Sequence, residues 1–438
     1  MSATIEIEQL RVGMFIHLDL GWWAHPFALS SFQIASPDQI DTLRALGLKK
    51  LRWSPEKSRA DDADVAAVDA AAAPPAPAAQ APASQTPVPT SGTAAEDDAA
   101  TRRQRSALAA QRAADATCER QYGEAGRAWK AATELVHAAP DQARHTVEGL
   151  TRALLDKMLV DGEMCIRVLS EGLGDRAGAH ALNVAVISLL MGRVFGLSAD
   201  ELLDMGVGAL LHDVGKLELP DRVRHADTHF TQAETTLYRE HVAHGVVHGK
   251  RMGLSPGALV VLAQHHEMTD GSGFPQRLNI DRMAAAARIV SLVNRYDNLC
   301  NPPSPALALT PHEALSLIFA QAKSKFDASM LNAFIRMMGV YPPGSLVQLT
   351  DDRYATVVSC NSSRPLKPRV LVCDTKVPVE QALLLNLDGQ VDLGIRRSLK
   401  ATQLPAAARD YLSPRQRMVY FFEPVPAEAA DALEALAA

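Results

Sequence analysis

The spacing of hydrophobic and polar residues changes along the chain, and near the N-terminus it predicts a small mixed domain. Ile5 and Ile7 lie two positions apart, and short apolar runs follow that are split by glycines. This alternation is typical of strands. Pro37 then precedes apolar residues at positions 40, 43 and 46, the spacing of a short helix. We therefore expect a small α+β domain over residues 1–58.

Longer apolar runs with helical spacing fill the middle of the chain. Val147, Leu150, Leu154 and Met158 recur every three or four residues, which predicts an amphipathic helix. Between residues 179 and 338 further runs of this kind are separated by turns rich in Gly, Pro and Asp. We expect a mainly α-helical domain over residues 116–338.

The pattern changes again in the last hundred residues. The apolar runs become short, as in "SLVQLT", "ATVVSC", "RVLVC", "ALLLNL" and "MVYFF", and such runs are typical of strands. Asp351-Asp352 and Asp388-Gly389 have the turn chemistry of hairpins. We expect a β-rich C-terminal appendage over residues 339–438, closed by a short Ala/Glu helix.

One segment lacks the residues that build a core. No Phe, Trp or Tyr lies between Trp53 and Tyr122, and the stretch "AAAPPAPAAQAPASQTPVPTSG" is rich in Ala and Pro. Acidic residues flank this stretch on both sides. Such a composition buries too little apolar surface to offset the entropy of ordering. We interpret residues 59–115 as a disordered Ala/Pro/acidic linker.

Composition narrows the function classes. The 438 residues are 47% hydrophobic, and 44 basic against 50 acidic residues give a net charge of -6, which argues against general nucleic-acid binding. The five cysteines are scattered without a CxxC pair, as in a reducing compartment. No stretch has the ~20 uninterrupted apolar residues of a membrane helix, and the first ten residues carry no basic cluster. We expect a cytoplasmic protein without membrane insertion.

The candidate chemistry lies in an ordered series of histidines. In chain order these are His180, the pair His212-Asp213, His241 and the pair His265-His266. Imidazoles and carboxylates are ligands for Fe, Mn, Ni or Zn, and a carboxylate beside an imidazole can bridge two cations. Taken singly, a histidine on an apolar helix face such as His180 is more often a core residue with satisfied hydrogen bonds, and His265-His266 fits an exposed helix end. The order of the whole series favours a metal centre.

The motifs that contain these residues resemble a known family. "HDVGK", "HVAHG" and "HHEMTDGSGFP" are similar to the signatures of the HD superfamily of metal-dependent phosphohydrolases, and within it of the HD-GYP cyclic di-GMP phosphodiesterases. Phe274 stands where the family has Tyr. The resemblance covers about residues 179–338, and "LRVGMFIHLDLGWWAHPF" looks like the small domain of unknown function often found ahead of HD-GYP modules.

This resemblance implies a helical bundle that holds two divalent metal ions, Fe or Mn by preference. The implied metal ligands are His180, His212, Asp213, His241, His265, His266 and Asn294, with Asp213 shared between the metals. A hydroxide that bridges the metals would attack the phosphorus, and Lys216 would stabilise charge on the phosphate oxygens. The loop with Gly271, Gly273, Phe274 and Pro275 would shape the substrate pocket beside a guanine.

The chain also departs from the family pattern at three places. Asn294 replaces the usual Asp, which removes a negative charge and favours weaker metal binding and weaker activity. Arg176 stands where members with three metals carry Glu, which argues for two metals at most. The usual Lys-Pro-Gly element is missing around Ala226 and Asp227, so Arg222 or Arg224 would have to bind phosphate in its place.

The resemblance implies hydrolysis of cyclic di-GMP to the linear dinucleotide pGpG, to GMP or to both. The alternative is a catalytically weakened HD-GYP module that binds cyclic di-GMP or docks a protein such as a diguanylate cyclase. A third hypothesis is a related HD phosphohydrolase for another nucleotide, against which the "DGSGFP" loop argues. A homodimer is compatible with each of these.

Overall fold

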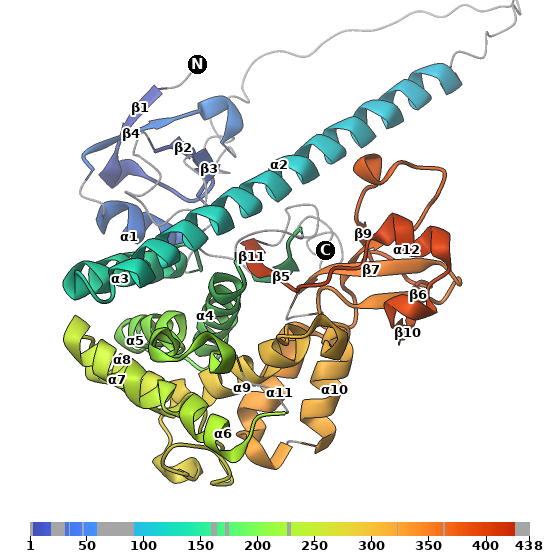
Figure 1. Cartoon of the computed structure of the whole chain (residues 1–438). Helices are drawn as coiled ribbons and strands as arrows, with labels where there is room; N and C mark the ends of the chain where they lie inside the picture. The colour runs from blue at the N-terminus through green and yellow to red at the C-terminus, as the bar shows by residue number, and fades with distance from the viewer. Residues whose placement is uncertain are drawn as a thin grey trace, which may run out of the picture. The chain divides into compact units, whose positions relative to one another are not determined.

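The computed structural model describes residues 3–18, 31–34, 36–45, 48–58, 92–158, 164–170, 175–225, 229–321, 323–361 and 364–424 (Figure 1). It divides into two compact units, each described here by itself. The first comprises residues 1–105 with 159–161, and the second comprises residues 106–158 with 162–438. Trp22, Trp23 and the predicted C-terminal Ala/Glu helix lie outside the described residues.

The first unit contains the predicted small α+β domain. Its sheet has the order β1-β4-β2-β3, with all pairs antiparallel. The elements are β1 (Ala3–Glu6), β2 (Phe15–His17), β3 (Ser31–Gln33), β4 (Lys50–Trp53) and α1 (Pro37–Ala45). Ile16, Ile34, Leu43 and Leu51 are buried in its core. The helix predicted from Pro37 onward is therefore confirmed.

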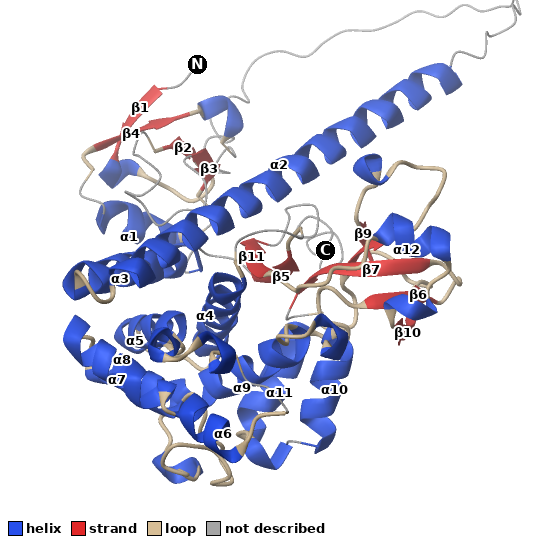
Figure 2. Ribbon diagram, viewed as in Figure 1, coloured by secondary structure: helices blue, strands red, loops and turns tan. Residues whose placement is uncertain are grey.

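The second unit is mainly helical and also contains strands (Figure 2). Its helices are α2 (Gly92–Leu135, which begins in the first unit), α3 (Pro140–Met158), α4 (Arg176–Val194), α5 (Ala199–Leu211), α6 (Gln232–Arg239), α7 (His241–Met252), α8 (Pro256–Gln264), α9 (Ala285–Cys300), α10 (Pro311–Gln321), α11 (Ala328–Met338) and α12 (Ala406–Leu412). A 3-10 helix, η4 (Val214–Glu218), follows α5.

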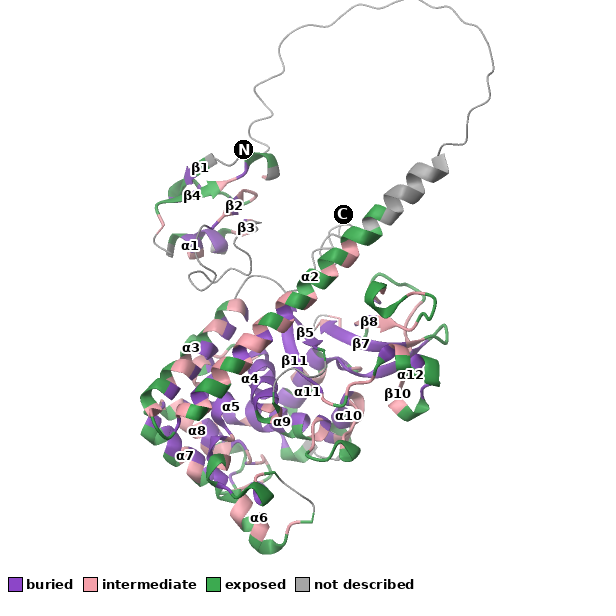
Figure 3. Cartoon of the chain, turned by 45° about the horizontal axis from the view of Figure 1, so that its top comes forward, coloured by how far each residue is buried: buried purple, intermediate pink, exposed green. Residues whose placement is uncertain are grey.

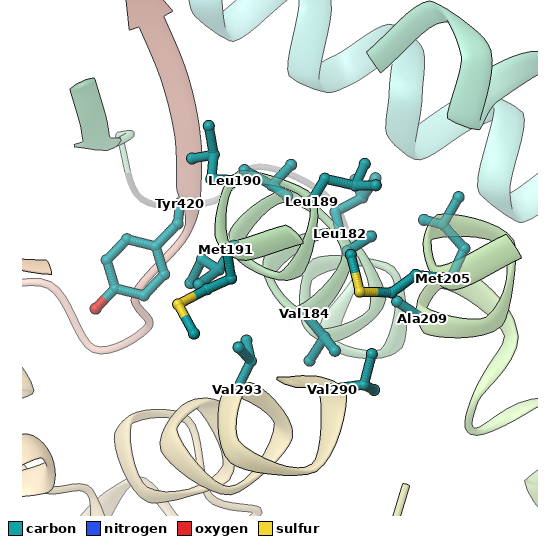
Figure 4. Close-up of a cluster of buried hydrophobic side chains, with 14 of the residues drawn as sticks. Leu182, Val184, Leu189, Leu190, Met191, Met205, Ala209, Val290, Val293 and Tyr420 are labelled. Atoms are coloured by element: carbon teal, nitrogen blue, oxygen red, sulfur yellow. The ribbon is translucent and has the colours of Figure 1, made fainter. Parts of the chain in front are cut away.

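Helix α4 is the centre of the bundle. It packs against α5, α9 and α11 and against strand β11, so it is apolar around most of its circumference. Figure 4 shows its side chains, such as Leu182 and Met191, among residues of α5, α9 and β11. Among the described helices only α4 is long and apolar enough to span a bilayer, and 78% of its most apolar stretch is buried inside the protein.

Local sequence explains where the bundle helices begin. Asp175 precedes α4 and its side chain accepts a hydrogen bond from the Gly178 amide at 2.8 Å. Ser198 and Glu201 form a capping box at the start of α5. These side chains bond backbone N–H groups that the first turn of a helix leaves without partners. They fix the direction in which α4 and α5 enter the core.

A seven-stranded antiparallel sheet completes the second unit. Its strands are β5 (Met164–Val168), β6 (Leu346–Leu349), β7 (Tyr354–Asn361), β8 (Arg369–Val372), β9 (Leu385–Asn386), β10 (Ile395–Leu399) and β11 (Tyr420–Pro424). The order is β10-β6-β7-β5-β11, and β8 pairs with β7 and β9. The β6–β7 turn contains Asp351 and Asp352, so this hairpin is confirmed.

The structure corrects two boundaries and one hairpin that were predicted from the sequence. Strand β5 lies within the range expected to be helical, and it pairs with β7 and β11 (Figure 3). Tyr420 and Phe421 of β11 are buried in the core of the helical bundle. The predicted domain boundary between residues 338 and 339 therefore does not separate two compact units. Residues 92–115, expected as linker, lie in α2, because Ala and Arg favour helix once the prolines end. Asp388-Gly389 joins no hairpin, since β9 pairs with β8 and β10 pairs with β6.

Candidate metal centre

The candidate ligands lie at the ends of helices. His180 is in the second turn of α4, His212 follows the last residue of α5, and His241 begins α7. His265 and His266 follow α8, while Asp213 lies between α5 and η4. The bundle brings these ends together, and all six side chains fall into two groups of potential metal-ligating atoms that share Asp213.

The first group contains His180, His212 and Asp213. The two Nε2 atoms are 3.1 Å apart, and Asp213 Oδ2 lies 3.6 Å from each. His212 is completely buried. Two imidazole nitrogens and one carboxylate oxygen therefore face one point.

The second group contains Asp213, His241, His265 and His266. The Nε2 atoms of His241 and His265 are 3.3 Å apart, and the other carboxylate oxygen, Asp213 Oδ1, lies 3.7 Å and 3.9 Å from them. Each oxygen of Asp213 thus faces a different set of imidazoles. This is the arrangement that a carboxylate shared between two cations requires.

Hydrogen bonds on the far side of each ring set its tautomer. The Nδ1 atoms of His212, His241 and His265 bond the backbone carbonyls of Ala209, Tyr238 and Leu262, each three residues earlier. A carbonyl only accepts, so these Nδ1 atoms carry the proton. The Nε2 lone pairs remain directed into the centre, as metal ligation requires.

His180 is oriented differently, by a buried carboxylate. Asp297 of α9 is fully buried, and its Oδ2 accepts from His180 Nδ1 at 2.6 Å. Its Oδ1 accepts from the side-chain amides of Asn183 and Asn301 at 2.7 Å and 2.9 Å. Asp297 therefore holds a candidate ligand in place from behind its ring.

The same amides connect the centre to strand β11. Asn183 Nδ2 donates to the Met418 carbonyl at 2.9 Å, and Asn183 Oδ1 accepts from the Tyr420 amide at 2.7 Å. Asn301 bonds the backbone of Met418 through both ends of its amide. The sheet that closes the second unit therefore contributes to the position of His180.

The electrostatics suit a cation site. Burial lowers the pKa of His212 to about 4 and lowers the pKa values of His241, His265 and His266, so these rings are neutral at pH 7. Burial alone would raise the pKa of Asp213, but the Lys216 ammonium, 2.6 Å from Oδ2, outweighs it and helps to hold that pKa well below its usual range. Neutral imidazoles and an ionised carboxylate are the ligand forms that bind divalent metals.

Two atoms of the centre point to the same conclusion. Asp213 Oδ1 and His266 Nε2 are buried, and neither has a hydrogen-bond partner among the described residues. A buried polar atom without a partner is unfavourable by about 1–3 kcal/mol. Bound cations would satisfy both atoms, so the residues present fit divalent metal ions.

Comparison with known proteins agrees with this geometry. Residues 163–330 match the family model described as HD domain, and residues 2–147 match the domain of unknown function DUF3391. The chain therefore contains an HD domain, preceded by a DUF3391 region. The DUF3391 match extends from the small N-terminal domain into α3.

Two relatives of this HD-domain protein are named as cyclic di-GMP phosphodiesterases. A cyclic di-GMP phosphodiesterase of Pseudomonas aeruginosa is 28% identical over 90% of this chain and 91% of its own. A cyclic di-GMP phosphodiesterase response regulator of Xanthomonas campestris pv. campestris is 31% identical over 34% of this chain and 39% of its own. Among solved structures, an HDG"Y"P protein from Bdellovibrio bacteriovorus matches 76% of this chain and 98% of its own, at 13% identity and a TM-score of 0.39.

A close backbone contact explains the glycine of "HDVGK" in the HD domain. A Cβ atom on Gly215 would lie 1.9 Å from the His241 carbonyl oxygen and 2.4 Å from the Gly245 nitrogen. Only glycine allows η4 to approach α7 this closely. This packing brings Asp213 and Lys216 beside His241.

The "DGSGFP" loop is fixed by a glutamate whose role the sequence analysis did not recognise. Glu267 is fully buried, and its two oxygens accept from the amides of Gln276 and Leu278 at 2.6 Å and 2.8 Å. A Cβ on Gly273 would lie within 2.6 Å of the backbone of residues 266–268. The loop is thereby held against the end of α8, and Gly271 makes its turn with a φ of +78°.

An aromatic surface results from this loop. Phe274 stacks on His266 with ring centroids 4.5 Å apart, and the Arg239 guanidinium lies 5.0 Å from the Phe274 ring centroid. The peptide bond between Phe274 and Pro275 is cis. The loop thus places a flat ring next to a cation and beside the candidate ligand His266, and such rings are able to stack on other planar groups.

Three remaining predicted residues contact partners outside the two groups. The Oδ1 of Asn294 accepts from Asn298 at 2.6 Å, on the helix that carries Asp297. Arg222 forms an ion pair with Glu234 at 3.8 Å, and Arg224 forms one with Asp221 at 2.9 Å. Residues 226 and 227, where the Lys-Pro-Gly element is missing, lie outside the described part of the chain.

Proposed function

We propose that this HD-domain protein hydrolyses cyclic di-GMP at the centre around Asp213. The carrying observation is the Asp213 carboxylate, which faces two imidazoles with one oxygen and a second set of imidazoles with the other. The names of the relatives in Pseudomonas aeruginosa and Xanthomonas campestris support cyclic di-GMP as the substrate.

We further propose that the centre takes two divalent cations, Fe or Mn. His180, His212 and Asp213 would hold one, with Asn294 completing the set, and Asp213, His241, His265 and His266 would hold the other. When bound, such a pair activates water and neutralises charge on a phosphodiester.

The chain's own residues would bind and orient the substrate. Lys216 is buried against Asp213 and is the nearest fixed cation for a phosphate oxygen. Phe274 and Arg239 would receive a guanine, with Gly271, Gly273 and Pro275 shaping the loop. Addition of one water across a P–O3′ bond would leave a 5′-phosphate and a free 3′-hydroxyl, which gives linear pGpG, and a second hydrolysis would give GMP.

Product analysis tests this proposal. The full chain is reconstituted anaerobically with Fe(II) or Mn(II), incubated with cyclic di-GMP and analysed by chromatography. Asp213→Ala is the inactive control, and Asp221→Ala, which removes an exposed carboxylate outside both groups, is the matched control. We expect pGpG or GMP from the wild type and from Asp221→Ala only. Absence of product from metal-loaded wild type would contradict the proposal.

A second candidate function rests on Asn294. An amide in place of a carboxylate lowers the charge of the first group, which favours a module that binds cyclic di-GMP, or a partner such as a diguanylate cyclase, without turnover. Binding of cyclic di-GMP to fully metallated protein with no product would support this function over hydrolysis.

A further inference from the structure

A third group of ligand atoms lies outside the proposed catalytic centre. It consists of His137 in the turn between α2 and α3, Glu218 at the end of η4, and His248 in α7. We propose that these three side chains form a separate site for a divalent cation of the zinc class.

The geometry brings three distant chain segments to one point. His248 Nε2 lies 2.8 Å from Glu218 Oε1, and His137 Nε2 lies 3.7 Å from the same oxygen. The two imidazole rings meet edge to face, with centroids 5.0 Å apart and an interplanar angle of 85°. One ligand atom from each residue lies within 4.8 Å of the others. A small rotation of the exposed His137 would bring all three onto one cation.

The donor set defines the chemical class of the ion. Two imidazoles and one carboxylate suit Zn²⁺ with one position left for water, while Mg²⁺ and Ca²⁺ prefer oxygen ligands. His248 is almost fully buried, and burial lowers its pKa, so its ring is in the neutral form that binds metal. The His137 side chain is 54% exposed, so an ion can enter from solvent.

The position of this site connects it to the catalytic centre through the chain. Glu218 lies two residues after Lys216 in η4, and His248 lies two helical turns after His241 in α7. A cation at the third group would join these two elements to the α2–α3 turn. It would stabilise the packing of η4 on α7 at Gly215, which positions Asp213. This inference does not depend on which nucleotide the centre hydrolyses.

Zinc binding by the full chain tests the inference. Metal-stripped wild type, His137→Ala and Glu218→Gln are compared with His145→Ala, which removes an exposed histidine of α3 outside the group. Zn²⁺ per chain is measured by equilibrium dialysis with mass spectrometry, and Tm is measured with and without Zn²⁺. Circular dichroism confirms that each variant is folded.

We expect wild type and His145→Ala to bind one Zn²⁺ more than His137→Ala and Glu218→Gln at matched free zinc. The affinity of this extra site should fall at least ~10-fold on loss of one ligand, and the zinc-induced rise in Tm should be smaller. Equal stoichiometry and equal Tm shifts in all four chains would overturn the inference and leave a hydrogen-bonded His–Glu cluster without a metal. Because the readout is a difference in zinc content, failure of the proposed hydrolysis would not affect it.

Discussion

The two halves of the metal centre are built by different means. In the half with His241 and His265, each ring is held by a carbonyl three residues earlier in its own chain segment. In the other half, His180 depends on Asp297 of α9, which is itself held by amides that also bond β11. The half with His241 and His265 is therefore specified by local backbone geometry. The half with His180 combines His212, which the Ala209 carbonyl holds locally, with His180, whose position depends on elements far apart in sequence.

This difference predicts how each half responds to substitution. Local hydrogen bonds form whenever the helix end forms. The half with His241 and His265 should therefore keep its ring orientations when residues elsewhere in the core are substituted. The His180 half should fail when any member of the Asp297 network is altered, because polar networks in a dry interior lose more than one bond at a time.

The largest effect is expected from Asp213→Ala, because Asp213 is the only described residue shared by both groups. Metal analysis of the reconstituted protein should show loss of metal from both halves, and hydrolysis of cyclic di-GMP should be abolished. His241→Ala should empty the second group alone. Retention of full metal content by Asp213→Ala would show that the halves are independent.

Asp297→Asn should damage the first half selectively. If the new amide nitrogen faces His180 Nδ1, the ring must take the tautomer with a proton on Nε2, which cannot ligate metal. If the amide is flipped, its NH₂ faces the donors of Asn183 and Asn301. We expect metal affinity of this half to fall about 10–100-fold. Calorimetric metal titration measures this affinity. An unchanged metal affinity of the group with His180 would exclude the role assigned to Asp297.

Asn183→Ala should lower the free energy of unfolding by about 1–3 kcal/mol, because it removes the side-chain acceptor of the Tyr420 amide. It also removes one of the two amide donors of Asp297 Oδ1 and of the Met418 carbonyl, which keep their bonds to Asn301. Ser188→Ala, at another buried position of α4, is the control: its hydroxyl has no hydrogen-bond partner among the described residues, so its removal should change stability by less than about 0.5 kcal/mol. Urea denaturation compares them. Equal losses in both variants would mean that the link to β11 contributes nothing.

The smallest effect is expected from Asn294→Asp, which adds a negative charge to the half with His180 and leaves the other half unchanged. Asn298 can still donate to the new carboxylate, so the fold should be unchanged. Metal affinity of the first half should rise by up to ~1.4 kcal/mol, about tenfold. Metal titration checks this, and the same affinity in both proteins would show that position 294 is not a ligand.

The sequence predicted the helical core well where its signals are local. The periodic run that contains Val147 and Leu154 is a helix, and the segment after Pro37 is another. The prediction was wrong where strand pairing is long-range. Strand β5 has the composition of a short core segment, and it is a strand only because it pairs with β7 and β11. The hairpin predicted at Asp388-Gly389 was wrong for the same reason, since β9 and β10 pair with strands elsewhere in the chain and not with each other.

By itself, the sequence determined the donor types of the centre and their order, because imidazole and carboxylate chemistry belongs to single residues and the motifs around His212 and His265 are short. Only the tertiary structure decided which oxygen of Asp213 faces which imidazoles, that Asp297 stands behind His180, and that His137 meets Glu218 and His248. These relations depend on the packing of helices from distant parts of the chain, which no local pattern encodes.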